Sequence, residues 1–178
     1  MDIISQIVQA AIEHPTPEMF KWFFERTQDH IARVANNMLR VADYYHLDKQ
    51  KLIMLSKQHD ASKYTAEECI FYVYLSWQHK MKNENKEYVM PEGMDEKINK
   101  ATMHHIKTNR HHPEFFDDPN DMELYDIIEM ACDWAAMSQE LGTSLKKWVQ
   151  EEGMVNYEWN TKNKTRIKNL ITIFKELK

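Results

Sequence analysis

The sequence predicts an all-α protein, and three observations support this prediction. Glycine occurs only three times in 178 residues, so the chain has few tight turns. Methionine, leucine, glutamate and lysine, which favour helices, are abundant. Apolar residues recur at helical spacing, with little of the alternation that is typical of β-strands. We therefore expect a single domain, residues 1–178, built from seven or eight helices.

Local signals set the expected helix boundaries. Thr16 can cap a long helix that has Pro17 at its first position, and Asp48 can cap the next helix. The segment 65–68 has the pattern of a capping box, and Gly142 is expected to end a later helix. The predicted helices cover residues 3–13, 17–45, 48–57, 65–82, 91–108, 121–141, 143–152 and 162–178, with loops over 83–90 and 109–119.

Composition excludes several classes of function. The net charge of -5 argues against a dedicated nucleic-acid binder, and no apolar run is long enough to span a membrane. The three glycines leave no phosphate-binding glycine loop. The N-terminal segment has no basic region or cleavage site typical of a signal peptide, and Cys69 and Cys132 cannot form a disulfide framework. We therefore expect a cytoplasmic protein.

Histidines and carboxylates indicate a metal site. His59 and Asp60 are adjacent at the end of an apolar stretch, and imidazole nitrogen with carboxylate oxygen suits a transition-metal cation. His30 flanks the apolar face of the long helix, where it could also be a hydrogen-bonded core histidine. Asp133 lies inside an apolar helix, where a buried carboxylate needs a cation. The alternative for Asp133 is an exposed stripe shared with Asp126 and Glu129.

The order His, His-Asp, Asp on successive helices resembles the HD-domain metal-dependent phosphohydrolases. The matching stretches are residues 30–35, 55–63 and 130–137. The resemblance covers about 28–140 and implies an HD-domain-like helical bundle, with further helices over 143–178.

The resemblance also implies a site. In it, His30, His59, Asp60 and Asp133 would bind one divalent ion, which we expect to be Mn, Co, Zn, Ni or Fe. Lys63 matches a lysine that often follows the HD pair, and it would lie near a substrate phosphate. A solvated lysine at a helix end is the alternative.

A second block contains four histidines within nine residues, His104 to His112. Together with residues 59–68, this block resembles an HD-like family of phage and bacterial genomes that has no established reaction. Its motifs are HD-x-S-K and H-x-x-x-N-x-H-H-x-E, and the second is matched here by His105, Asn109, His111, His112 and Glu114. Some HD proteins hold two metal ions, so His105 and His112 are candidate ligands of a second ion. Which of the four histidines face an ion stays open, and a polar loop rich in histidine is the alternative.

Other residues are candidates for catalysis or substrate binding. Glu68 follows the HD pair and could transfer a proton, although the capping box gives it a structural role as well. Arg33 and Arg110 could contact phosphate, and His111 could contact the substrate. Most arginines in proteins are simply solvated, which is the alternative for both.

These observations lead to three hypotheses for the function. The first is a metal-dependent phosphohydrolase that uses metal-activated water on a small phosphate ester, a nucleotide by family analogy. The second is an HD-type di-iron oxygenase, and the third is a non-enzymatic HD-like binding module of phage or bacterial origin. No membrane partner is expected. The apolar stripe of the last helix either docks on the bundle or pairs with a second subunit in a homo-oligomer.

Overall fold

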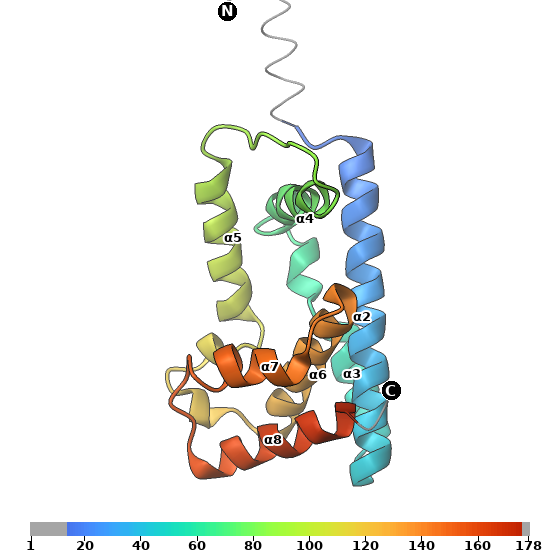
Figure 1. Ribbon diagram of the computed structural model, residues 1–178, viewed down its shortest axis with the longest axis vertical. Helices are drawn as coiled ribbons and strands as arrows, with labels where there is room; N and C mark the ends of the chain where they lie inside the picture. Colours follow the sequence, from blue (N-terminus) through green and yellow to red (C-terminus); the bar gives the residue numbers. More distant parts are fainter. Residues whose placement is uncertain (1–13, 176–178) are drawn as a thin grey trace, which may run out of the picture. The chain divides into compact units, whose positions relative to one another are not determined.

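The computed structural model describes residues 14–175, and within them it contains seven α-helices and no β-strand, so the all-α prediction is confirmed (Figure 1). The α-helices are α2 (Pro17–Tyr45), α3 (Lys49–Gln58), α4 (Cys69–Asn83), α5 (Met94–Thr108), α6 (Leu124–Leu141), α7 (Leu145–Trp148) and α8 (Thr161–Lys175). Short 3₁₀ turns are η1 (Ala61–Tyr64), η2 (Pro113–Phe115) and η3 (Pro119–Asp121), and a π-helical turn, η4 (Val149–Gly153), follows α7. The predicted helix over 3–13 lies outside the described residues.

Several of the predicted helix caps are confirmed. The Thr16 hydroxyl accepts a hydrogen bond from the backbone N–H of Met19 at the start of α2. The carboxylate of Asp48 accepts the backbone N–H groups of Gln50 and Lys51 at the start of α3. Gly142 ends α6 in the left-handed region, with φ of 62°, where a residue without a Cβ is favoured.

Three predicted helix starts are wrong by a few residues. The segment 65–68 does not form a capping box, because the side chain of Glu68 makes no capping hydrogen bond and α4 begins at Cys69. The helix predicted from Pro91 begins at Met94. The helix predicted from residue 121 begins at Leu124, because residues 119–121 form a 3₁₀ turn and the N–H of Glu123 bonds to the side chain of Asp126.

The chain divides into two compact units, each with its own apolar core. Among the described residues, the first unit contains 14–28 and 62–105. Its core brings together the first turns of α2 with α4 and α5. The buried apolar side chains of this core are Met19, Phe23, Val73, Tyr74, Met94 and Ile98.

The second unit contains residues 29–61 and 106–175. Helix α6 is its centre, since it packs against α3, α7 and α8 (Figure 1). Every side chain of α6 from Asp126 to Cys132 is buried. The apolar stripe of α8, including Ile167, Leu170 and Ile171, is buried in the same core. None of the helices described over 14–175 has the length and apolar character that a membrane crossing requires.

Candidate metal centre

Three helices of the second unit supply the residues of a candidate metal centre. His30 lies on α2, and Asp133 lies on α6. His59 is the residue at which α3 ends, and Asp60 follows it in the left-handed region with φ of 58°. Because the backbone turns sharply there, the two adjacent side chains can face one point, which successive residues of a continuous helix do less readily.

Four ligand atoms meet at this point. The Nε2 atoms of His30 and His59 are 3.4 Å apart, and each lies 3.7–3.8 Å from Oδ2 of Asp60. Oδ1 of Asp133 lies 2.9 Å from Nε2 of His30 and 3.8 Å from Nε2 of His59. Ligands of one transition-metal ion, bound at about 2.0–2.2 Å, stand about 2.8–3.6 Å from one another. Two of these five distances fall within that range and the other three lie 0.1–0.2 Å above it, so a carboxylate oxygen from each aspartate lies close to where an ion held by the two histidines would need it.

The charges around His59 also favour a cation. Burial lowers the pKa of His59, but Asp60, Glu129 and Asp133 outweigh it, so the pKa is raised above its ordinary value. The pKa of Asp133 is lowered, because the hydrogen bond and charge of His30 and the charge of His59 overcome the opposing effect of burial. Positive charge is thus stabilised where the four atoms meet, and the residues present fit a divalent ion.

Glu129 is a member of this site that the sequence analysis missed. Its Oε1 accepts a hydrogen bond from Nδ1 of His59 at 2.9 Å, which leaves the Nε2 lone pair of that ring free to bind a metal. The predicted alternative of an exposed acidic stripe is wrong, since Asp126 and Glu129 are both buried. The available signal was spacing: Glu129 precedes Asp133 by one helical turn, so both lie on one face of α6.

His111 also lies in this cluster, although the sequence suggested a substrate contact. Its Nδ1 is 3.4 Å from Oε1 of Glu129, and its Nε2 is 3.6 Å from Oδ1 of Asp60. The two oxygens of Asp60 therefore face different histidines: Oδ2 faces His30 and His59, while Oδ1 faces His111. Groups of three ligands within reach of one ion include His30, His59 and Asp60, and also His59, His111 and Glu129.

The two arginines that were predicted to contact phosphate bind carboxylates. Arg110 donates from Nε and Nη2 to both oxygens of Asp126, at 3.0 and 2.9 Å. This bidentate ion pair links the 106–123 segment to α6. The Arg110 guanidinium is therefore bound to a carboxylate of the protein itself. Arg33 lies 3.9 Å from Glu140 of α6, and its side chain is about one third exposed.

A cavity of about 320 Å³ opens beside the candidate metal centre. Asp133 lines it, together with His112, whose ring centre lies 4.3 Å from that of His111. A small molecule in this cavity would therefore contact one of the four converging side chains.

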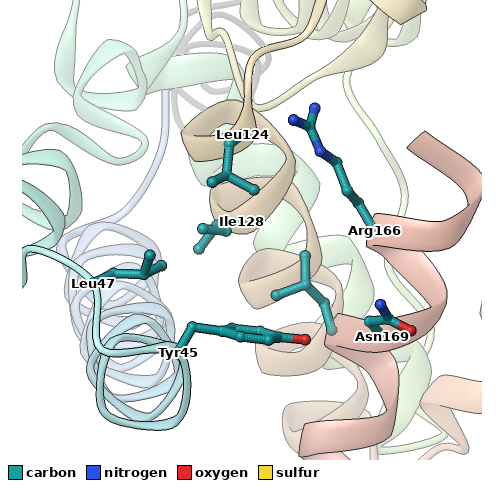
Figure 2. A pocket seen from close by; sticks show the side chains of 7 residues that line it. Tyr45, Leu47, Leu124, Ile128, Arg166 and Asn169 are labelled. Carbon is teal, nitrogen blue, oxygen red and sulfur yellow. The ribbon is translucent and has the colours of Figure 1, made fainter. Parts of the chain in front are cut away.

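A second cavity of the same unit, of about 260 Å³, contains none of the predicted site residues. Figure 2 shows Tyr45 and Leu47 across the cavity from α8, with Leu124 and Ile128 of α6 between them. Arg166 and Asn169 of α8 border the same cavity (Figure 2).

The first unit holds a separate cluster around Glu68. This side chain is fully buried, and its two oxygens accept hydrogen bonds from Nδ1 of His104 and Nδ1 of His105, both at 2.8 Å. Burial raises the pKa of Glu68, but the bonds from His105 and His104 outweigh it, so the pKa is lowered and the carboxylate stays charged. The two carboxylate oxygens of Glu68 thus hold the rings of His104 and His105 in place.

Two other predicted residues belong to the first unit. His105 is buried, and Oγ of Ser62 lies 3.1 Å from its Nδ1. The ammonium of Lys63 lies 5.3 Å from the ring centre of Tyr72.

Replacing Glu68 by glutamine should destabilise the protein. A neutral amide offers one oxygen acceptor where the carboxylate offers two, so one of the two charge-assisted bonds from His104 and His105 would be lost. A hydrogen bond to a charged group contributes about 1.5–3 kcal/mol. Chemical denaturation of Glu68→Gln beside the wild type measures the change. Glu67→Gln, at an exposed neighbour, is the matched control, and equal stability of all three proteins would contradict the prediction.

A model of a family of unknown function, DUF5662, matches residues 19–176 of the chain. No curated protein and no solved structure matches the chain. The match covers most of the chain, including every residue of the candidate metal centre. The chain therefore belongs to the DUF5662 family of unknown function.

Proposed function

We propose that the protein is a metal-dependent phosphohydrolase that acts on a small phosphate ester, with a nucleotide as the expected substrate. The observation that carries this proposal is the meeting of four ligand atoms, from His30, His59, Asp60 and Asp133, at spacings that suit one divalent ion. The resemblance of the same residues to the HD-domain phosphohydrolases supports the choice of reaction.

The chain's own residues have distinct roles in this proposal. His30, His59, Asp60 and Asp133 would hold the ion, and Glu129 orients His59. When bound, such an ion lowers the pKa of a coordinated water and so provides a nucleophile near neutral pH. The cavity that Asp133 lines gives a phosphate ester a route to this place.

A second ion is compatible with the same residues. Oδ2 of Asp60 lies 3.7–3.8 Å from His30 and His59, whereas Oδ1 lies 3.6 Å from Nε2 of His111. His111 and Glu129 would then join Asp60 and the histidines as residues that could hold it. The metal content should be one or two equivalents, drawn from Mn, Co, Zn, Ni and Fe.

Metal content and phosphate release together test the proposal. The purified full chain is loaded with each of the five metals, analysed for bound metal, and incubated with nucleotides and ribose 5-phosphate. We expect inorganic phosphate to be released only by metal-loaded protein and not by Asp60→Asn. Asp43→Asn, at an exposed carboxylate paired with Lys49, should retain activity.

Other results would overturn the proposal. Metal-loaded protein that releases no phosphate from any of these esters is not a phosphohydrolase of this kind. Two equivalents of iron with oxygen consumption would favour the di-iron oxygenase. Protein that takes up none of the five metals would favour the binding module.

A further inference from the structure

The cavity beside Asp133 is large enough to hold part of a substrate. Its volume of about 320 Å³ lies at the lower end of the range for small-molecule sites. Asp133 lines the cavity, and Oδ1 of this residue is 2.9 Å from Nε2 of His30. A molecule that fills the cavity therefore extends from the candidate metal centre toward α7 and η4.

Aromatic side chains form the walls of this cavity. Trp134 and Trp148 meet edge to face, with ring centres 4.8 Å apart, and Tyr157 adds a third ring. Trp148 is 39% exposed, so part of its surface remains available for contact. Planar molecules bind well against such surfaces.

The backbone next to the two indoles depends on Gly153. A Cβ at this position would lie 2.9 Å from the ring of Trp134 and 3.1 Å from that of Trp148, so a side chain would displace them. Gly153 ends the π-helical turn η4, and its carbonyl accepts the Nε1–H of Trp159 at 2.9 Å. Because π-helical turns occur often at functional sites, this arrangement fits a built pocket.

The charged side chains that line the cavity determine which chemical group of a substrate can bind there. Asp133 and Glu152 line the cavity, whereas no lysine or arginine is among the described residues that do so. Asn156 donates from Nδ2 to Oε2 of Glu152 at 3.1 Å. Away from the metal-binding atoms, a phosphate group would meet Glu152 without a lysine or arginine to balance its charge. An uncharged planar group with N–H donors would instead find aromatic faces and a carboxylate acceptor.

We propose that this cavity binds the heterocyclic part of the substrate, a nucleobase, with Trp134 and Trp148 providing apolar contact and Glu152 accepting from an amino group. The inference rests on the proposed function for the position of the phosphate, which would lie at the Asp133 end. Binding of the base can be measured without hydrolysis, so the two proposals can fail separately.

Calorimetric titration of the metal-loaded full chain with adenosine, guanosine, cytidine and uridine tests the pocket. Loss of one base–aromatic contact should weaken binding roughly 5- to 150-fold, so Trp148→Leu should have this effect. Glu152→Gln, at an exposed residue, should weaken binding of the three nucleosides with an exocyclic amino group more than that of uridine. Tyr45→Leu removes an aromatic side chain from the other cavity and should leave all four affinities unchanged.

Each result decides between the proposals. Nucleoside binding that depends on Trp148 or Glu152 supports the pocket, and if no phosphate is released from nucleotides it also overturns the proposed hydrolysis. Absent nucleoside binding, or equal binding by all variants, overturns the pocket. Equal phosphate release from ribose 5-phosphate and from nucleotides would likewise overturn the pocket while leaving the hydrolase proposal intact.

Discussion

Replacing Asp60 by asparagine should lower the metal affinity of the protein at least about 100-fold, because loss of a partner that only orients a ligand already costs about 10–100-fold. Oδ2 of Asp60 faces both Nε2 atoms, and Oδ1 faces His111, so a single substitution removes the carboxylate shared by the whole cluster. Competition with a chromogenic chelator measures the affinity, and elemental analysis measures the metal retained after dialysis.

Asparagine is a sharper substitution here than alanine. Asp60 has a φ of 58°, and asparagine tolerates this left-handed conformation much better than alanine does. The metal-free variant should therefore unfold at nearly the same temperature as the metal-free wild type, which separates loss of metal from loss of fold. If Asp60→Asn keeps wild-type affinity, the four converging atoms are not the metal ligands.

The proximity of the metal-binding candidates could be predicted from sequence, but their partners could not. The order of His30, His59, Asp60 and Asp133 on successive helices was visible as a motif. Glu129 has no such marker, because an acidic residue on a helix is usually solvated. Its burial follows from the central place of α6, which packs against helices distant in sequence. That packing is a tertiary effect which local patterns do not report.

The error at the start of α4 has a similar cause. Thr65 and Glu68 have the spacing of a capping box, yet Glu68 bonds to two histidines of α5 instead. A buried carboxylate gains more from two charge-assisted bonds than from one backbone N–H. Helix ends were predicted better where a single residue decides the geometry, as with Gly142. Local chemistry was thus sufficient for caps that face solvent and insufficient where a distant element competes.

Two substitutions of Glu129 should weaken metal binding to different degrees. Comparing them separates the effect of its negative charge from its role in orienting the His59 ring. The pKa of Glu129 is lowered, since the hydrogen bonds from His111 and His59 outweigh the effect of burial, so the side chain is ionised. Glutamine can still accept from Nδ1 of His59 but has no charge, so Glu129→Gln should lose about tenfold in metal affinity. Leucine can do neither, and Glu129→Leu should lose about 100-fold.

Asp126→Asn is the matched control for both variants of Glu129. Asp126 is also a buried carboxylate of α6, near the start of the helix, but it pairs with Arg110 and not with a histidine. This variant can lose stability while keeping its metal affinity, and Glu129→Gln should do the reverse. Equal affinities for Glu129→Leu and the wild type would contradict the orienting role, because the imidazole of His59 would then hold its Nε2 toward the ion without help. If metal affinity falls with Glu129→Gln and falls further with Glu129→Leu, both the charge and the hydrogen bond of Glu129 contribute to the metal affinity of the site.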